Sequence, residues 1–317
     1  MKTYRPALFV ALAALIWGTD SLVRYPAASQ LPPSVLVLLE HLIGLVLVAP
    51  IVMIKYRHEF KKLNAADLSL ALCVGLAGAC LGGIFYTSSI TRIGPSASTL
   101  FQMIQPLFVL GLAYFFLREK RSSSFFQVGV WVALNAILLG LPDFNFGFLA
   151  MKDSQQSQGV LYGFLAMTMW GISTVAGKAL LSKYSPVVVV FFRFLIASFS
   201  LSLIVGLRGS AIPWRTIATI NMGAPLLYLG SFAGVFAMWV YYKGMQSLPA
   251  SIVTFIELLY PLAGVLFPVL YFGSSISGIQ TFGAIALIFS LLLLLGLEYP
   301  TLRRHEIREL RTGRTAL

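Results

Sequence analysis

The sequence predicts an all-α integral membrane protein, with ten transmembrane helices arranged as two inverted five-helix repeats around a central cavity. Three observations predict this fold class: an apolar composition, a series of ten apolar runs, and an internal repeat. Of the 317 residues, 58% are hydrophobic and only 11% are charged, with a mean hydropathy of +0.85. A soluble fold of this length cannot bury so much apolar surface, so lipid must solvate most of it.

The ten apolar runs are each long enough to cross a bilayer as a helix. They cover residues 6–23, 34–54, 66–89, 95–117, 124–141, 159–181, 185–206, 218–242, 250–272 and 277–297. The first run has no obvious small-residue cleavage site, so we expect a retained first helix rather than a signal peptide.

An internal repeat relates the two halves of the chain. Trp17-Gly18 and Trp170-Gly171 lie 153 residues apart, and the same offset relates Pro33 to Pro186 and Glu40 to Arg193. Further on, an offset of 155 relates five more pairs: Tyr86 and Tyr241, Ser96 and Ser251, Thr99 and Thr254, Gln102 and Glu257, Pro106 and Pro261. Because five spans per copy is an odd number, the second copy should lie inverted in the membrane, as in many secondary transporters.

The repeat divides the chain into four parts. We expect the first five-helix repeat at 1–141, a connector at 142–158, the second repeat at 159–298 and a basic cytoplasmic tail at 299–317. The polar stretch 152–158 predicts a flexible linker, and the hydrophilic tail needs no fold of its own.

The basic residues gather in short connectors and the tail. If the N-terminus is cytoplasmic, seventeen basic side chains fall inside and five outside, the five being Arg24, Arg92, Lys152, Arg208 and Arg215. This positive-inside asymmetry predicts that both termini are cytoplasmic. It also accounts for the formal charge of +12 without a nucleic-acid partner.

The duplicated segments resemble EamA-type permeases of the drug/metabolite transporter superfamily. The matching segments are Ala14–Gly18, Met167–Gly171, Arg193-Phe194, Tyr86, Ala97-Ser98, Gln105–Leu107, Arg118-Glu119, Tyr241, Ala250-Ser251 and Tyr260–Leu262. The resemblance implies ten helices around a central cavity that moves small metabolites by alternating access. Many such permeases export amino acids, and others carry nucleotide-sugars or nucleosides. Glu40 departs from the pattern, since an arginine comparable to Arg193 is expected at its position, and Glu119 has no counterpart in the second half.

The charged residues within the spans are the first candidates for a site, because an isolated charge in a membrane is costly. At 1.5 Å per residue, Arg193 and Glu257 share one depth, and Glu40 shares another with Gln102. Arg193 and Glu257 could form a structural ion pair or contact a substrate. Glu40 has no basic residue obviously at its level, so it could exchange protons, accept a substrate amine, or pack against Gln102 or a backbone carbonyl.

The remaining candidates come from the aromatic and proline positions. Trp17, Trp170, Tyr86 and Tyr241 could line the cavity or pack in the core. The predicted substrate-binding residues are therefore Glu40, Trp17, Tyr86, Gln102, Trp170, Arg193, Tyr241 and Glu257. Pro106 and Pro261 are candidate gating bends. The remaining acid–base pair, Asp20 and Arg24, is expected to be a surface pair at the outer end of the first span.

Function classes other than transport find little support. The chain has no metalloprotease, nucleophile-elbow or phosphate-loop motif and three histidines, so we expect no enzyme, cofactor or metal. Cys73 and Cys80 are expected to be small packing residues.

We expect a secondary active transporter that exports an amino acid or related metabolite, coupled to protons, as a monomer or homodimer. The alternatives are an uncoupled facilitator or importer of nucleoside-like or nucleotide-like solutes, and a membrane enzyme or receptor. The absence of an Asn-x-Ser/Thr sequon fits a bacterial inner membrane.

Overall fold

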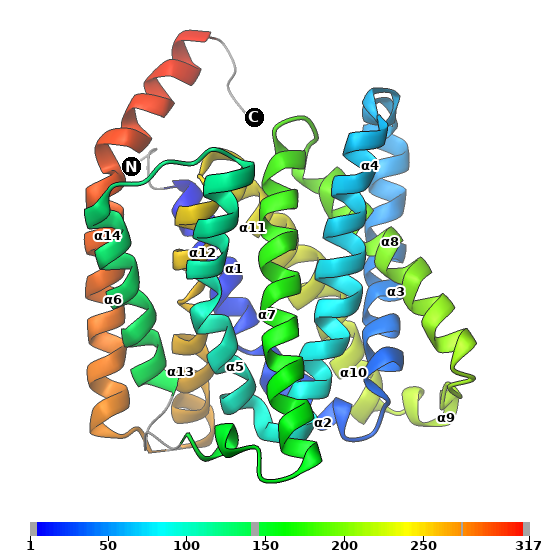
Figure 1. The fold of residues 1–317 in the computed structure, drawn as a ribbon. Helices are drawn as coiled ribbons and strands as arrows, with labels where there is room; N and C mark the ends of the chain where they lie inside the picture. The colour runs from blue at the N-terminus through cyan, green and yellow to red at the C-terminus, as the bar shows by residue number, and fades with distance from the viewer. Residues whose placement is uncertain (1–4, 141–145, 274, 313–317) are drawn as a thin grey trace.

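The protein is a bundle of long helices that run along a common direction (Figure 1). The computed structural model describes residues 5–140, 146–273 and 275–312. Within these ranges nine helical segments are long and apolar enough to cross a membrane. Helix α1 (Arg5–Trp17) begins, and helix α14 (Gly278–Thr312) finishes, at the same end of the bundle (Figure 1). The chain is therefore an integral membrane protein with an all-helical fold.

Seven helical elements lie between α1 and the last helix of the first half. They are α2 (Asp20–Ala28), α3 (Pro33–Ile51), the π-helix η2 (Val52–Tyr56), the 3-10 helix η3 (Arg57–Lys62), α4 (Ala65–Leu72), the π-helix η4 (Cys73–Leu81) and α5 (Gly82–Phe116). Helix α6 (Ser123–Gly140) follows. The predicted first span, 6–23, is thus two helices with a break at Gly18 and Thr19.

The second half begins with the 3-10 turn η5 (Gly147–Ala150) and continues in a similar order. Its elements are α7 (Ser154–Leu181), α8 (Pro186–Leu207), α9 (Trp214–Ile217), α10 (Ile220–Leu227), the π-helix η6 (Tyr228–Phe236), α11 (Ala237–Ser247), α12 (Ala250–Glu257), α13 (Tyr260–Phe272) and α14.

One candidate span, Ala65–Phe116, has 52 residues, more than twice what a bilayer crossing needs. Gly94 interrupts it with φ 81° and ψ 163°, and Pro95 follows. Only glycine adopts that φ readily, and proline cannot continue the helical hydrogen bonds of the preceding turn. The break falls between the predicted runs 66–89 and 95–117.

The offset of 155 residues also relates whole helical elements. Helix α4 maps onto α10, and η4 maps onto η6, with both ends of each element in register. The position equivalent to Gly94 is Pro249, between α11 and α12. π-helical segments are rare, so their recurrence at equivalent positions is not a product of apolar composition alone.

Helices from the two halves interleave rather than forming separate bodies. Helix α3 packs on α8, α1 on α11, α5 on α7 and α6 on α14. Close approach of α3 and α8 depends on Gly44, because a Cβ there would lie 2.0 Å from the Phe194 ring. The outward side chains are apolar, such as Ile54 at 75% exposed and Phe199 at 74%, as lipid contact requires.

Two expectations from the sequence were wrong. The predicted linker 152–158 is largely helical, because α7 begins at Ser154 after Asp153 accepts a hydrogen bond from the Gln156 amide, 2.7 Å away. This is the capping that starts many helices. The tail after Glu298 also has a fold, since α14 continues to Thr312.

Candidate functional site

A central cavity between the two halves receives side chains from most of the helices. Its wall includes all eight predicted substrate-binding residues: Trp17, Glu40, Tyr86, Gln102, Trp170, Arg193, Tyr241 and Glu257. It also includes residues that the sequence did not single out as ligands, namely Asp20, Arg24, His41, Gln105, Thr254 and Tyr260. That these residues bind substrate remains a prediction.

Two tryptophan–tyrosine pairs form matching parts of the cavity wall. Trp17 and Tyr241 have ring centroids 5.1 Å apart, and Trp170 and Tyr86 have the same separation. The ring planes are inclined by 56° and 51°, respectively. Each pair joins one helix of the first half to one of the second, and the repeat offset converts one pair into the other.

The indole N–H groups fix these rings to π-helical backbone. Trp17 Nε1 donates to the Ala233 carbonyl oxygen at 3.0 Å, and Trp170 Nε1 donates to that of Gly78 at 2.9 Å. Ala233 and Gly78 are again 155 residues apart. A π-helical turn leaves carbonyl groups without their usual partner four residues on, so each irregular segment supplies the acceptor that orients a cavity-lining tryptophan.

A polar layer lies between α5 and the α12–α13 region. Gln105 Nε2 lies 3.5 Å from Glu257 Oε2, and the Tyr260 hydroxyl lies 3.5 Å from the side-chain amide of Gln102. Gln102 and Glu257 are 155 residues apart, and so are Gln105 and Tyr260, so the repeat converts each of these contacts into the other. The Tyr260 hydroxyl also donates to the Thr99 carbonyl oxygen at 2.9 Å.

The predicted ion pair between Arg193 and Glu257 is not formed. Arg193 Nη1 instead donates to Ser173 Oγ at 3.1 Å and, less closely, to the Val74 carbonyl oxygen at 3.4 Å. Glu257 accepts a hydrogen bond from the Tyr241 hydroxyl. A shared depth fixes only the height of a side chain, and the helix rotations direct these two toward different neighbours.

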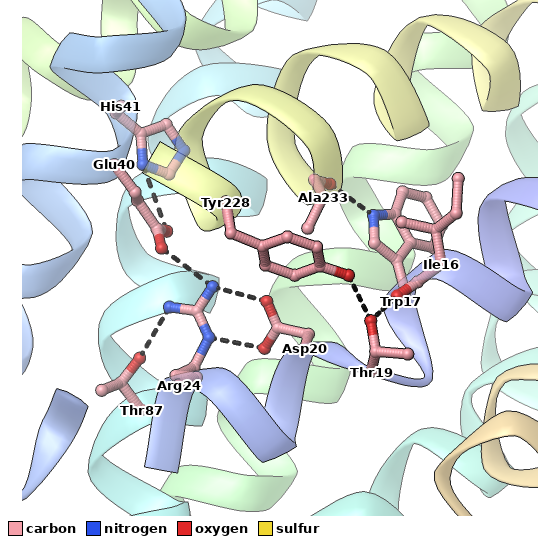
Figure 2. Close-up of polar contacts among 10 residues, drawn as sticks. All are labelled: Ile16, Trp17, Thr19, Asp20, Arg24, Glu40, His41, Thr87, Tyr228 and Ala233. Carbon is pink, nitrogen blue, oxygen red and sulfur yellow. Dashed lines mark hydrogen bonds and ion pairs between the residues drawn. The ribbon is translucent and has the colours of Figure 1, made fainter. Parts of the chain in front are cut away.

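Glu40 is not unpaired, and Asp20 and Arg24 are not at the surface. Figure 2 shows the Arg24 guanidinium between two carboxylates. Its Nε and Nη2 atoms lie 2.6 and 2.9 Å from the Asp20 carboxylate, and Nη2 also lies 2.9 Å from Glu40 Oε2. Arg24 is only 8% exposed and Glu40 6%. With both carboxylates ionised, this buried cluster carries one net negative charge.

The surroundings of this cluster tie three helical elements together. Arg24 Nη1 lies 3.4 Å from the Thr87 hydroxyl of α5, and His41 Nδ1 lies 3.4 Å from Glu40 and 2.7 Å from the Val37 carbonyl oxygen. The closer contact to Val37 assigns the ring proton to Nδ1, because a carbonyl oxygen can only accept. Close by, the Thr19 hydroxyl contacts the Tyr228 hydroxyl of η6 (Figure 2).

The two predicted gating prolines do not line the cavity. Pro106 is buried within α5, which continues through it, whereas Pro261 is the second residue of α13, just after the break at Leu258 and Leu259. Their role in gating stays a prediction. Cys73 and Cys80 are free thiols, and no cluster of metal-ligating side chains occurs within the ranges that the structure describes.

Polar contacts between the halves gather at the end of the bundle where α1 begins. Glu119 accepts bonds from the Ala250 and Ser251 amides at 2.8 and 3.1 Å, and Arg121 Nη1 lies 2.8 Å from Glu298. These contacts hold the start of α12 against the α5–α6 connection.

A second set of contacts lies between η3, α4 and the turn from α7 to α8. Asp67 contacts Lys183 and accepts a hydrogen bond from the Tyr184 hydroxyl at 2.8 Å, while Glu59 accepts one from the Ser185 amide at 2.9 Å. Burial, followed by the hydrogen bond to Asp67, raises the pKa of Tyr184, so its phenol remains a donor.

Comparison with known protein families identifies the chain. The family model described as "EamA-like transporter family" matches residues 5–141 and again residues 157–296. The chain belongs to the EamA-like transporter family. It is accordingly a membrane transporter of the drug/metabolite type, which agrees with the resemblance seen in the sequence motifs.

Individual relatives of this EamA-family protein are also named transporters. One, named riboflavin transporter ImpX, from Fusobacterium nucleatum, is 29% identical over 293 residues, which cover 90% of this chain and 96% of the relative. Another, an uncharacterized inner membrane transporter YhbE of Escherichia coli K12, is 23% identical over 73% of each chain. A solved crystal structure shares the fold, with a TM-score of 0.72 at 18% identity, covering 92% of this chain and 98% of the other.

Proposed function

We propose that this protein is a secondary transporter that moves a planar, polar solute through the central cavity by alternating access. The observation that carries the proposal is the pair of tryptophan–tyrosine contacts, each with centroids 5.1 Å apart, on the wall of one cavity. Aromatic faces of this kind stack against flat ring systems, and the amides and carboxylate beside them suit polar edges of the same solute.

We propose ten spans in two inverted repeats, at 1–141 and 159–298, joined by the connector 142–158. Division of Ala65–Phe116 at Gly94 supports that count, since Pro249 divides the equivalent stretch of the second half. The exchange of contacts under the 155-residue offset supports the repeat. Five spans per repeat require inversion, which is the basis of alternating access in many transporters.

Riboflavin is the first substrate to test. The relative from Fusobacterium nucleatum is named a riboflavin transporter and aligns over nearly its whole length. The flat ring of riboflavin fits the chemistry of the two aromatic pairs, and its hydroxyl-rich side chain fits the polar layer of Gln102, Gln105 and Tyr260.

An aromatic amino acid is the second candidate, favoured by two charges on the cavity wall. Arg193 has no carboxylate within 4.0 Å, and Glu257 has no basic group within that distance, among the described residues. A zwitterion can neutralise one charge of each sign, which would offset the cost of holding both in a membrane. Amino acid export, expected from the sequence, therefore remains open to test.

Proton coupling is proposed at the cluster of Asp20, Arg24 and Glu40. Two carboxylates share one guanidinium in a buried site, so the second negative charge can be removed by a proton from the cavity. An inward proton gradient would then drive the solute outward. We propose a bacterial inner membrane and cytoplasmic termini, with the contacts of Asp67 and Glu119 closing the cytoplasmic end.

Reconstituted proteoliposomes test this function. The expected result is saturable flux of radiolabelled riboflavin that an imposed pH gradient accelerates and excess unlabelled riboflavin suppresses. Competition by phenylalanine, tyrosine and tryptophan, and direct flux of the labelled amino acids, distinguish the second candidate. Absence of flux for both groups of solutes would overturn the proposed substrate class.

A further inference from the structure

We propose that a second pocket, at the end of the bundle opposite α4, is a binding site for a phosphate group. It lies between the α2–α3 turn, the part of α5 before Gly94, the first half of α7 and the end of α8. Its polar lining includes Ser34, Ser88, Arg92, Arg208 and Ser210. It is separate from the central cavity and has no residue in common with it.

The charges of this pocket have one sign. Arg92 and Arg208 line it, no acidic residue lines it, and neither arginine has a carboxylate within 4.0 Å among the residues described. Arg92 Nη1 donates to the Ser88 carbonyl oxygen at 2.9 Å, while its Nε is buried without a partner. Because neither guanidinium group has a counter-ion among the described residues, an anion from outside the chain would be attracted to both.

The Arg92 guanidinium is held in place by an aromatic stack. It lies 5.0 Å from the centre of the Tyr162 ring, and Tyr162 stacks on Phe85 at 5.7 Å with an interplanar angle of 12°. A cation over an aromatic face loses mobility and part of its hydration. The Arg92 guanidinium is therefore oriented before a ligand binds.

Two buried serines and a helix terminus add neutral donors. Ser34 is 5% exposed and Ser88 7%, and both line the pocket. Ser34 is also the second residue of α3, whose N-cap, Pro32, makes no side-chain cap. The free N–H of such a terminus favours an anion.

The donors of the pocket are two guanidinium groups, serine hydroxyls and the backbone N–H at the start of α3, and this set suits a phosphate group. Guanidinium groups bind phosphate oxygens in pairs, and hydroxyl and amide donors fill the remaining oxygen positions. Arg92 belongs to the first half and Arg208 to the second, so a bound phosphate would connect the halves at this end. The group could be the headgroup phosphate of a phospholipid or a free phosphate from the aqueous phase.

The full-length protein, purified in detergent and stripped of lipid, tests the site by titration with inorganic phosphate. The double change Arg92→Gln/Arg208→Gln should weaken binding by at least about tenfold, since charge-assisted bonds are lost. Arg215→Gln is the matched control, because Arg215 is exposed on α9 and does not line the pocket. Ser34→Ala/Ser88→Ala keeps both charges and should weaken binding less.

Nanodiscs separate the two sources of phosphate. If the ligand is a lipid, phosphatidylglycerol mixed into phosphatidylcholine should raise the Tm of the wild type but not of the double arginine variant. A response to inorganic phosphate alone would assign the site to a free phosphate. The proposal is overturned if the wild type responds to neither probe, if the double variant binds like the wild type, or if Arg215→Gln weakens binding equally. Because Arg208 is exposed, Arg208→Gln alone tests the site if the double variant fails to fold.

Discussion

Arg24 Nη2 lies 2.9 Å from Glu40 Oε2, although the two residues come from helices α2 and α3. The same guanidinium holds the Asp20 carboxylate through two further contacts, at 2.6 and 2.9 Å. The central charges of the first half are therefore organised around one buried arginine.

Replacement of Arg24 should be strongly destabilising. Arg24→Gln leaves two carboxylates buried without a cation, and breaking a buried pair in this way costs about 3–5 kcal/mol of unfolding free energy. Thermal unfolding in detergent measures the loss. Arg215→Gln is the control, because an exposed arginine should change stability by less than about 0.5 kcal/mol. Equal stability of the two variants would mean that the buried cluster contributes little.

Replacement of Glu40 should uncouple transport without unfolding the protein. In Glu40→Gln, Arg24 keeps Asp20 as its partner, so the cluster becomes neutral and has no excess negative charge for a proton. We expect flux in proteoliposomes to lose its response to a pH gradient, with a normal Tm. Wild-type flux with an unchanged pH response in this variant would rule out the coupling role of Glu40.

Arg193 and Glu257 should act independently in a double-mutant cycle. They form no ion pair, so the stability losses of Arg193→Ala and Glu257→Ala should add to within about 0.5 kcal/mol. Chemical or thermal unfolding of the two single variants and the double variant provides the coupling energy. If the double variant is clearly more stable than the Arg193→Ala variant, the two residues do interact as the structural ion pair that the sequence suggested.

The two cavity tryptophans should respond alike to substitution. Trp17→Phe and Trp170→Phe each keep an aromatic face but remove the N–H bonded to Ala233 or Gly78, which leaves a carbonyl unsatisfied. We expect KM for the transported solute to rise severalfold in both. Trp131→Phe is the matched control, since Trp131 is 63% exposed on α6. An equally large change in KM in the control would indicate that Trp17 and Trp170 do not contact the substrate.

The sequence located the cavity wall better than it located the charge pairs. Trp17, Trp170, Tyr86 and Tyr241 were found because a duplication repeats the residues that meet at the centre, and that signal needs no coordinates. The same offset could have added Gln105 and Tyr260, which are 155 residues apart.

The Asp20–Arg24 pair was expected and is formed, but its burial and its contact with Glu40 were missed, because depth along a span gives no direction around it. The first span was also treated as one straight helix. In the structure α1 ends at Trp17 and α2 begins at Asp20, and this break directs Arg24 inward to Glu40. A hydropathy run records apolar length and does not reveal such a change of direction.

Glu119 lies at the end of the bundle where α1 begins, and its contacts should stabilise that end. Its carboxylate caps α12 by accepting from the Ala250 and Ser251 amides at 2.8 and 3.1 Å. Glu119→Ala should therefore lower the unfolding free energy by about 1–2 kcal/mol, as loss of a helix cap does. Because the same contact holds α12 against the α5–α6 connection, Ser251→Cys in a background without Cys73 and Cys80 should react faster with a water-soluble maleimide once Glu119 is replaced. Lys120→Ala is the control, since Lys120 is exposed beside Glu119. Unchanged stability and unchanged labelling in the Glu119→Ala variant would show that this contact does not close the end of the bundle.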